Sequence, residues 1–383
     1  MAIRTSVDAF IRKFEKDFAT HNRIEVSKSA LLHNAALFAR LSGKQVVPVL
    51  KGNAYGHGIE QVAAALKDGD FPYVAVDGYF EALRVRKVSR QPVLIMGAIK
   101  PENFAKLKYD RLAFVVQDEQ TIQALGATGK RIAVHLECNT GMNRYGAGPD
   151  ELAALTKLIL SYPNLTLEGV MSHLADSDGT SKTTVARAVK KFDDCVEAVR
   201  NAGAAPTLLH VAQTAGSLRA DSKYANAMRL GIGLYGINPF SSGHPVHAKL
   251  EELRPALRFV STITKVIDLK KGDQVSYNYT FTAPKDMRIG VLPAGYYEGI
   301  PRALSNAGLI SYDNSYLPIV GRVCMNHTMV ELTPQAKAND EVTVYSADPT
   351  SKTSIDQVAR NHDLFNYNLL TALSPDVRRV LVK

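Results

Sequence analysis

The sequence of 383 residues lacks several features that would assign a protein to a particular class. No stretch approaches the ~20 apolar residues that span a bilayer, which excludes a transmembrane helix. The N-terminal region has no apolar segment of signal-peptide length, so we expect no export. The three cysteines, Cys138, Cys195 and Cys324, are far apart. Their spacing predicts neither a disulfide framework nor a metal site, and it favours a reducing, cytoplasmic compartment.

The sequence also lacks the usual signs of nucleic-acid or dinucleotide binding. The formal charge is +9, but the basic residues are scattered and form no dense run. We therefore expect no nucleic-acid partner, and a basic surface suits an enzyme with anionic ligands equally well. No GxGxxG follows the first predicted strand, which disfavours a dinucleotide fold. The composition, 46% hydrophobic and 22% charged, is that of a globular protein.

Residues 23–249 alternate between short apolar runs and helical patterns. Eight such units in about two hundred residues predict an α/β fold, a parallel (β/α)8 TIM barrel. An open doubly wound sheet is the alternative. The predicted strands end near Leu50, Val76, Met96, Val116, Leu136, Met171, Val211 and Ile232. Helical patterns cover residues 59–68, 80–88, 149–160 and 183–202.

The regions on either side of the barrel follow other patterns. Residues 250–383 contain strand-like runs separated by turns, which predict a C-terminal, mainly antiparallel β domain. These runs cover residues 259–269, 288–292, 316–323, 328–332, 341–345 and 377–382. Residues 1–22 place Val7, Phe10, Ile11 and Phe14 at helical spacing, which predicts a short amphipathic helical extension that packs on the body. A membrane-surface helix is the less favoured alternative.

The segment 46–58, VVPVLKGNAYGHG, combines a buried strand with a lysine and a glycine-rich turn. Its mostly β-branched start predicts a strand that is buried on both faces. Lys51 follows at the carboxyl end, where a barrel enzyme places its chemistry. Partial desolvation there lowers the pKa of an amine and prepares it for Schiff-base formation. Tyr55 could reach an anionic group near the same turn.

Other chemically active side chains follow later strands of the predicted barrel. Glu137, Asn139 and Arg144 come after the fifth strand, and His173 after the sixth. The seventh strand carries His210 and leads to Gln213 and Thr214, and the eighth contains Arg229 before Gly231 and Ile232. Each residue has a structural explanation of its own, such as a helix cap at Thr214. Their common placement at one barrel face predicts a shared site.

The lysine segment resembles the cofactor-lysine motif of the alanine racemase family, the fold-type III enzymes that use pyridoxal 5'-phosphate. The resemblance implies that Lys51 binds the cofactor covalently and that Tyr55 binds its phosphate. HLECNTGMNRYG resembles the segment whose arginine binds the substrate carboxylate and steadies the catalytic tyrosine, here Arg144. GVMSHLADSD resembles the segment whose histidine supports that tyrosine, here His173.

The resemblance extends to the end of the chain. HVAQTAG implies that the hydroxyl of Thr214 binds phosphate in place of the usual serine, and AMRLGIGLYG implies that Arg229 contacts the pyridine nitrogen. The amides of Gly231 and Ile232 are the other implied phosphate ligands. In the second domain, three segments resemble those of the catalytic tyrosine, the substrate-access residue and the carboxylate contact. They are VSYNYTFTA, LPAGYYEGIPRALSN and VGRVCMN, which imply these roles for Tyr277, Tyr296 and Met325.

The resemblance implies an isomerase with two catalytic bases. Lys51 and Tyr277 would transfer the α-proton on opposite faces of the substrate, with L- and D-alanine as the expected pair. D-alanine would supply peptidoglycan synthesis. The family also implies a homodimer in which the second-domain groups act on the partner's barrel. The guanidinium of Arg229 does not give up a proton, so the ring nitrogen should stay neutral and reprotonation at the α-carbon should be favoured.

Four departures leave the substrate range open. Glu137 stands where many members carry a carbamylated lysine, and it could pair with Arg144 as an anion. Asn139 and Asn326 replace common aspartates, and Pro375 replaces a tyrosine that narrows the pocket. The two asparagines and the proline resemble those of broad-spectrum racemases, which accept serine, lysine or other amino acids. More distant alternatives are a fold-type III decarboxylase, which Arg229 disfavours, and a non-enzymatic pyridoxal-phosphate carrier, which would lack the second domain.

Overall fold

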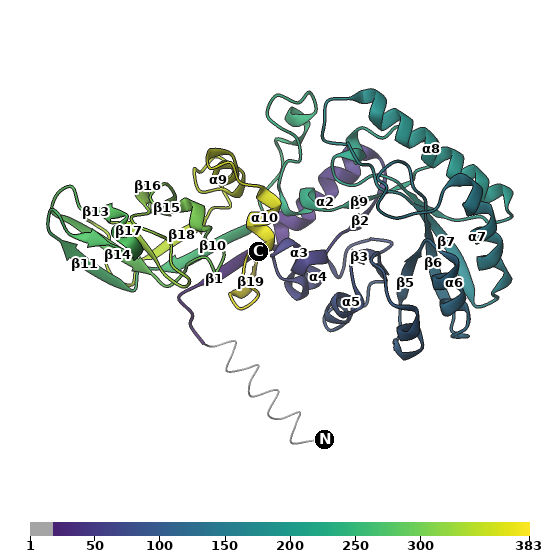
Figure 1. The fold of residues 1–383 in the computed structure, drawn as a ribbon, viewed down its shortest axis with the longest axis horizontal. Helices are drawn as coiled ribbons and strands as arrows, with labels where there is room; N and C mark the ends of the chain where they lie inside the picture. The colour runs from purple at the N-terminus through teal and green to yellow at the C-terminus, as the bar shows by residue number, and fades with distance from the viewer. Residues whose placement is uncertain (1–17) are drawn as a thin grey trace, which may run out of the picture. The chain divides into compact units, whose positions relative to one another are not determined.

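A computed structural model describes residues 18–383 (Figure 1). The helical pattern predicted from Val7 to Phe14 lies outside the described residues. Contacts divide the chain into two compact units. The barrel unit consists of Val26–Leu257, Ala347–Pro349 and Leu381–Lys383, and the β unit contains 18–25, Arg258–Ser346 and Thr350–Val380. The domain boundaries proposed from the sequence, at residues 22/23 and 249/250, stay predictions.

The barrel unit is built around eight parallel strands. They are β2 (Gln45–Pro48), β3 (Val74–Val76), β4 (Val93–Ile95), β5 (Leu112–Val116), β6 (Ile132–Glu137), β7 (Leu165–Met171), β8 (Leu208–His210) and β9 (Ala227–Leu230). Strands β3 to β8 form one sheet in sequence order, and β2 pairs with β9. The Leu50 amide donates to the Ala75 carbonyl at 2.7 Å, which joins β2 to β3.

Asn226 closes the other gap, between β8 and β9. Its amide donates to the Leu209 carbonyl at 3.0 Å, and its Oδ1 accepts from the Leu209 amide at 2.9 Å. An asparagine side chain therefore replaces part of the ladder between the two strands. The circle of strands is complete, and the predicted TIM barrel is confirmed. Small and branched side chains, among them Val47, Val49 and Ala75, pack together in a core cluster of this unit.

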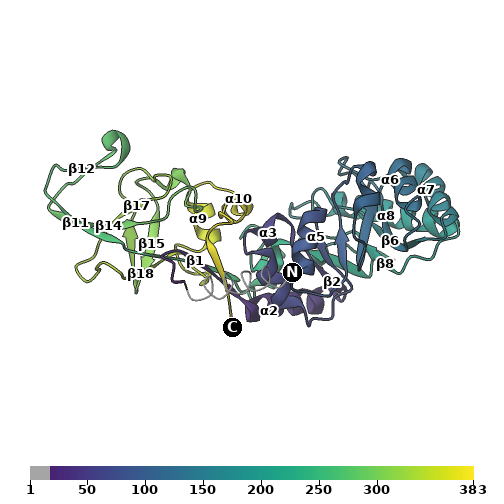
Figure 2. The ribbon, with the colours of Figure 1, turned by 90° about the horizontal axis from the view of Figure 1, so that it is seen from below.

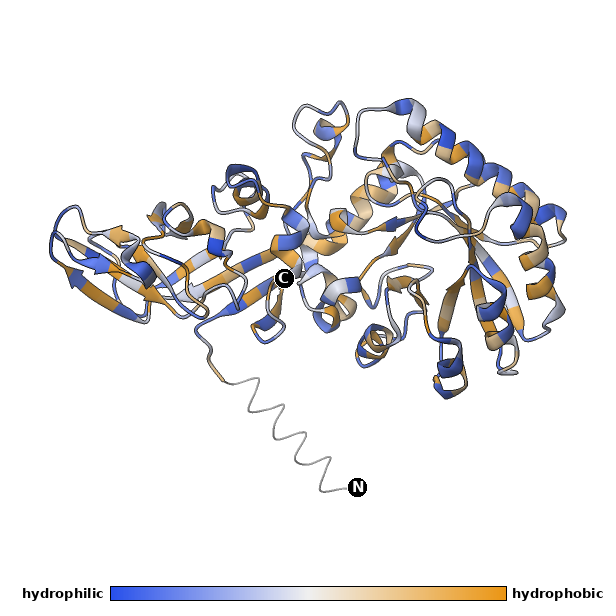
Figure 3. Cartoon of the chain, in the orientation of Figure 1, coloured by the Kyte–Doolittle hydropathy of each residue, from blue (hydrophilic) through white to orange (hydrophobic). Residues whose placement is uncertain are grey.

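Helices surround the strands, as Figure 1 shows. They are α2 (Lys28–Ser42), α4 (Ile59–Leu66), α5 (Tyr79–Arg86), α6 (Glu119–Gly126), α7 (Pro149–Ser161) and α8 (Lys182–Asn201). Figure 3 shows apolar and polar residues alternating along α8, whose apolar members Val185, Val189, Phe192 and Val196 are buried. This spacing gives one apolar face, as expected for a helix that packs on a sheet. After β4, β8 and β9 only 3-10 turns follow: η1 (Pro101–Lys106), η2 (Gly216–Leu218) and η3 (Ile232–Tyr235).

The β unit is mainly antiparallel, as predicted. Its largest sheet has the order β16-β15-β18-β10-β1-β19, beside a sheet β11-β14-β17 and a hairpin β12-β13. Figure 2 shows the β12 segment at the same end of this unit as β11. The bounds are β1 (Arg23–Ser27), β10 (Leu257–Thr262), β11 (Lys265–Leu269), β12 (Gln274–Val275), β13 (Phe281–Thr282), β14 (Met287–Leu292), β15 (Leu309–Tyr312), β16 (Ser315–Pro318), β17 (Thr328–Glu331), β18 (Glu341–Tyr345) and β19 (Arg378–Val382). Two short helices, α9 (Ile355–Asn361) and α10 (Asn366–Thr371), precede β19.

Two predicted strands of the β unit differ from the structure. The run 259–269 is two strands, because the chain leaves one sheet after Thr262 and enters another at Lys265. Between them the Ile263 amide donates to Asp340, and the Thr264 amide donates to Val291. The run 316–323 ends early, at Pro318, and Gly321 adopts a positive φ of 77° that a strand does not use.

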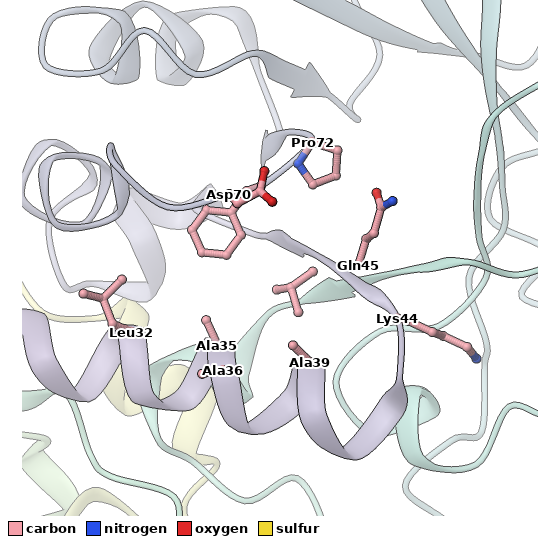
Figure 4. A pocket seen from close by; sticks show the side chains of 10 residues that line it. Leu32, Ala35, Ala36, Ala39, Lys44, Gln45, Asp70 and Pro72 are labelled. Atoms are coloured by element: carbon pink, nitrogen blue, oxygen red, sulfur yellow. The ribbon is translucent and has the colours of Figure 1, made fainter.

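A cavity of about 380 Å³ lies beside α2 (Figure 4). Figure 4 shows Ala35 and Ala39 on one wall, with Gln45 and Pro72 across from them. Gln45 begins β2, and Pro72 precedes β3, so the cavity lies at the amino ends of the strands. The chemistry of TIM barrels sits at the opposite, carboxyl ends. Among residues 18–383, no helix combines the length and hydropathy that a membrane span needs.

Candidate active site

The turn that carries Lys51 is left-handed. The element α3 (Lys51–Tyr55) follows β2, and Gly52, Asn53, Ala54 and Tyr55 all have φ between 50° and 63°. L-residues avoid this region, and a run of them costs about 1–2 kcal/mol per residue. Such a turn persists only where its surroundings hold it, which is typical of functional sites. Lys51 is half-buried at its start, as predicted for the end of the first barrel strand.

Two hydroxyl groups, those of Tyr55 and Thr214, lie close to Gly231. A Cβ built on Gly231 would lie 2.8 Å from Tyr55 Oη and 3.8 Å from Thr214 Oγ1. Thr214 Oγ1 accepts from the amides of Gly231 at 3.1 Å and Gly233 at 3.3 Å. Its own hydrogen has no acceptor among residues 18–383 and is left to donate. Burial raises the pKa of Tyr55 to about 12, so its hydroxyl stays protonated.

Arg229 is buried at the end of β9, two residues before Gly231. Its Nη1 donates to His210 Nδ1 at 2.7 Å and to the His210 carbonyl at 2.6 Å, and its Nη2 donates to the Ser172 carbonyl at 2.5 Å. Its Nε has no acceptor in the described part of the chain. Burial lowers the pKa of Arg229 to about 10, Glu137 raises it and Arg144 lowers it, so the guanidinium stays charged at neutral pH.

Arg229 fixes the protonation of a chain of buried histidines. A guanidinium only donates, so His210 Nδ1 accepts and His210 Nε2 carries the proton. His210 Nε2 then donates to His135 Nδ1 at 2.8 Å. Burial lowers the pKa of His135 to about 3, with Arg229 adding to the effect, and it also lowers the pKa of His210. Both rings are therefore neutral at working pH.

His173 belongs to the same network and is also neutral. Arg229 Nη2 lies 3.4 Å from its Nδ1, which places the histidine proton on Nε2. Burial, followed by the charges of Arg229, Arg144 and Lys51, lowers the pKa of His173 to about 3. The structure thus brings His173, Arg229, Arg144 and Lys51 within electrostatic reach of one another. Any positive charge in this group comes from Lys51 and the two arginines, and not from His173.

Glu137 and Arg144 interact electrostatically, but they form no ion pair. Glu137 ends β6 and is 5% exposed, whereas Arg144 lies on an exposed loop. Burial raises the pKa of Glu137, and Arg229 and Arg144 lower it in part. No ion pair within 4.0 Å joins Glu137 to Arg144 in the described residues. The direct pairing that we considered from the sequence is therefore a longer-range attraction, shared between two arginines. Nearby, Asn139 Oδ1 accepts from the Gly141 and Asn143 amides and shapes the loop.

A second group of predicted site residues lies in the β unit. Ser276, which precedes Tyr277, has a positive φ of 68°, and its Oγ donates to the Arg322 carbonyl at 2.7 Å. The Tyr296 amide donates to the Cys324 carbonyl at 3.0 Å. Tyr277 and Tyr296 are 66% and 43% exposed. These contacts hold both tyrosines beside the loop of residues 322–326 and leave their rings accessible.

Met325 lies on that same loop and is 54% exposed. A Cβ on Gly295 would lie 2.4 Å from the Met325 carbonyl, so only glycine fits there. Glu298 ties the loop down, because it accepts from Asn326 Nδ2 at 2.7 Å and from the Gly295 amide at 2.7 Å. Asparagine, unlike the aspartate expected from the resemblance, can donate to this carboxylate. Pro375 lies on an exposed turn between α10 and β19.

The donor groups of the barrel unit fit an anionic, nitrogen-containing cofactor. The hydroxyls of Tyr55 and Thr214 lie close to Gly231, where the Tyr55 hydroxyl leaves no room for a side chain. The Ile232 amide is the first of η3, a position that has no acceptor within a helix. The Gly231 amide already donates to Thr214 and supports the site through that hydroxyl. Arg229 Nε is available for one more acceptor. These residues suit pyridoxal 5'-phosphate, with its phosphate and ring nitrogen.

Several residues of the site were not singled out from the sequence. His135 and Ser172 extend the Arg229 network, and Ser172 Oγ lies 2.8 Å from Thr140 Oγ1. Tyr235 donates to the Val49 carbonyl at 2.8 Å and supports the strand before Lys51. His135 gave a detectable signal, since a histidine within the apolar strand IAVHLE needs a buried partner. Ser172 and Tyr235 gave none, because their roles depend on contacts between strands.

The fold agrees with comparisons to known proteins. Residues 26–239 match the family model "Alanine racemase, N-terminal domain", and residues 256–381 match "Alanine racemase, C-terminal domain". The chain is 30% identical to alanine racemase 2 of Caldanaerobacter subterraneus subsp. tengcongensis, with 94% of both chains covered. It is 31% identical to an alanine racemase of Syntrophobacter fumaroxidans, with 92% of this chain and 95% of that one covered.

Solved structures give the same result. An alanine racemase of Clostridium difficile 630 superposes with a TM-score of 0.87 at 26% identity, covering 96% of this chain and 97% of that one. Both halves of the sequence and the whole fold are thus accounted for by one family. The chain belongs to the alanine racemase family, whose members are isomerases.

Proposed function

We propose that this protein is a pyridoxal 5'-phosphate-dependent racemase that interconverts L- and D-alanine. One observation carries the proposal. Lys51 and Tyr55 share a turn at the end of β2, Arg229 and Gly231 stand at the end of the paired strand β9, and the Tyr55 hydroxyl lies against Gly231. The names of the relatives, alanine racemases, support alanine as the substrate. D-alanine would then serve peptidoglycan synthesis.

The cofactor would be held by residues of the barrel unit. Pyridoxal 5'-phosphate supplies an electron sink that acidifies the α-hydrogen of an amino acid. Lys51 Nζ would attach it covalently. The hydroxyls of Tyr55 and Thr214 and the Ile232 amide would bind its phosphate, while the Gly231 amide holds the Thr214 hydroxyl in place. Arg229 would face its ring nitrogen as a donor, because its guanidinium keeps its protons below a pKa of about 10.

Two bases would then move the α-proton. Lys51 Nζ would act on one face of the substrate and Tyr277 Oη on the other. A tyrosine has an ordinary pKa near 10, so it needs nearby positive charge to act as a base. His173 is neutral and would supply a hydrogen bond from Nε2, and the charge would come from Arg144 and Arg229.

The second base would come from another copy of the chain. Tyr277 is exposed on the β unit, outside the barrel unit that carries Lys51. We propose a cytoplasmic homodimer in which the partner's Tyr277 completes each site. Arg144 and the partner's Met325 would bind the substrate carboxylate, and the partner's Tyr296 would line the access path. The exposure of Tyr277, Tyr296 and Met325 supports this arrangement.

A broader racemase is the second candidate. Pro375 and Asn326 favour it, because both are exposed and neither supplies the tyrosine ring or the aspartate expected from the resemblance. A fold-type III decarboxylase is disfavoured by the buried cation Arg229. A non-enzymatic carrier is disfavoured by the β unit and its exposed Tyr277.

Exchange of the α-hydrogen with deuterated solvent tests the proposal. We would compare alanine, serine and lysine as substrates, in the native protein and in Pro375→Tyr. Exchange of alanine with loss of optical activity is expected. Comparable specificity constants for serine or lysine, lowered by Pro375→Tyr, would establish the broader racemase. Carbon dioxide release, or no exchange by a protein loaded with cofactor, would contradict racemisation.

A further inference from the structure

The left-handed turn of Lys51 is held from outside by one carboxylate. Glu81, in the first turn of α5, accepts through Oε1 from the Gly52 amide at 2.7 Å and from the Asn53 amide at 3.4 Å. These are the first two amides after Lys51. The other oxygen, Oε2, accepts from the Asp77 amide at 2.9 Å, just before α5. Glu81 therefore connects the lysine turn to the start of a neighbouring helix.

The other contacts of the turn do not replace this one. Within it, the Ala54 amide donates to the Leu50 carbonyl at 2.8 Å, and the Gly56 amide donates to the Gly52 carbonyl at 3.0 Å. Neither uses the amides of Gly52 and Asn53. Since the backbone from Gly52 to Tyr55 adopts a conformation that L-residues avoid, it needs an external partner to stay there.

A second set of contacts holds the far side of the turn. Asn53 Oδ1 accepts from the Ile59 amide at 3.1 Å and from Arg84 Nη2 at 2.9 Å. Arg84, one helical turn after Glu81 on α5, also forms a bidentate pair with Glu60 at 2.7 Å and 2.6 Å. Helix α5 thus contacts the turn through two of its polar side chains. Glu81 bonds to backbone next to Lys51, and Arg84 bonds to the side chain of Asn53.

We propose that Glu81 is a positioning residue for the cofactor site: its carboxylate anchors the left-handed turn and fixes where Lys51 Nζ and Tyr55 Oη are presented. The inference rests on the proposed function, because Lys51 and Tyr55 are the residues that would attach the cofactor and bind its phosphate. Glu81 itself would touch neither cofactor nor substrate. Loss of the Glu81 carboxylate should free the turn and weaken cofactor retention more than it affects the rest of the barrel.

The chain offers a matched control for helix capping. Glu151 stands at the same position of α7 as Glu81 on α5, three residues after a glycine N-cap. Its Oε2 accepts from the amide of the N-cap residue Gly148 at 2.9 Å, and Glu81 accepts from Asp77, the residue before its N-cap. Glu151 makes no contact with the lysine turn. Glu151→Ala therefore measures the loss of a helix cap alone.

The experiment compares Glu81→Ala, Glu81→Gln, Glu81→Asp and Glu151→Ala. Amide hydrogen exchange over residues 50–58 would be followed in the cofactor-free protein, and dissociation of pyridoxal 5'-phosphate by loss of its visible absorbance. We expect Glu81→Ala to speed exchange at Gly52 and Asn53 and to weaken cofactor binding by about tenfold or more, as for a lost hydrogen bond to a charged acceptor. Glu81→Gln keeps one acceptor oxygen but sets an NH2 donor against a backbone amide, so its effect should lie between those of the native protein and Glu81→Ala.

Glu81→Asp keeps the charge but is one methylene shorter, so it should behave like the alanine variant; it provides the test if Glu81→Ala does not fold. Exchange and cofactor release in Glu81→Ala or Glu81→Asp that match Glu151→Ala would overturn the inference. The proposed function fails separately, if the native protein binds no pyridoxal 5'-phosphate. In that case the exchange of Gly52 and Asn53 still shows whether Glu81 anchors the turn.

Discussion

Thr214 accepts from two backbone amides through a single oxygen atom, which we also propose as a phosphate ligand, and two substitutions test this oxygen apart from the methyl group. Thr214→Val removes Oγ1, which accepts from the amides of Gly231 and Gly233. Thr214→Ser keeps that oxygen and removes only the methyl group. The side chain is 3% exposed, so neither variant gains access to bulk water that could replace the lost contacts.

The magnitude follows from this geometry. A buried donor that loses its acceptor costs about 1–3 kcal/mol, and Thr214→Val leaves two such amides. Added burial of a methyl group offsets part of this cost, so we expect a loss of about 2 kcal/mol in the free energy of unfolding. Thr214→Ser gives up one buried methyl group, which is worth about 0.8 kcal/mol. The valine variant should therefore be the less stable of the two by about 1 kcal/mol.

Urea unfolding of the cofactor-free variants measures this difference, and titration with pyridoxal 5'-phosphate measures the site. Thr214→Val should bind the cofactor about tenfold more weakly, because it loses a donor to phosphate. Thr214→Ser should bind within about threefold of the native protein. A valine variant as stable as the serine variant, with equal cofactor affinity, would refute the role given to the oxygen.

Three further predictions concern catalysis and pH. Mixing Lys51→Ala chains with Tyr277→Phe chains should restore activity, because one site in each mixed dimer keeps both bases; chain exchange without recovery would exclude a shared site. Glu137→Gln should lower turnover with little loss of bound cofactor, because Arg144 loses the electrostatic attraction of a nearby anion. Native activity should not depend on bicarbonate. Unchanged turnover in Glu137→Gln would show that Glu137 has no role in the site. Its unfolding free energy at pH 7 should not fall, because burial already raises the pKa of Glu137 and disfavours its charged form. Each buried neutral histidine lowers stability by about 1.4 kcal/mol per pH unit below 6.5, where the unfolded chain binds a proton and the folded chain does not. His135, with its pKa near 3, should show this between pH 6.5 and 5. In His135→Phe the unfolding free energy should therefore depend less on pH, by the uptake of one proton on unfolding.

The barrel and the position of Lys51 were predictable from the sequence for the same reason. Strands buried on both faces need continuous apolar runs, and such runs end abruptly where polar residues begin at the barrel mouth. Lys51 stands at such an end, and the run LAFVV matches β5 residue for residue. The way β8 joins β9 was not predictable, because Asn226 completes the ladder with its side chain and no local pattern marks that use.

The fine geometry of the site depends on interactions between distant segments. Glycines at positions 52 and 56 indicate a tight turn, yet nothing local shows that Ala54 and Tyr55 share the left-handed conformation, which such residues avoid. Contacts from α5 hold it. Likewise, the sequence suggested that Glu137 pairs with one arginine, whereas in the structure the charges of Arg229 and Arg144 both act on the buried Glu137 carboxyl. In the β unit, the strand-like run 259–269 has no glycine or proline to mark the change of sheet at Ile263.

The attachment of the cofactor to Lys51 tests the account most directly. The native protein would be incubated with pyridoxal 5'-phosphate, reduced with borohydride and digested, and the labelled peptide identified by mass spectrometry. The account predicts one label per chain, on Lys51, and none in Lys51→Ala. A label on any other lysine of the native protein, or no stable label at all, would contradict it.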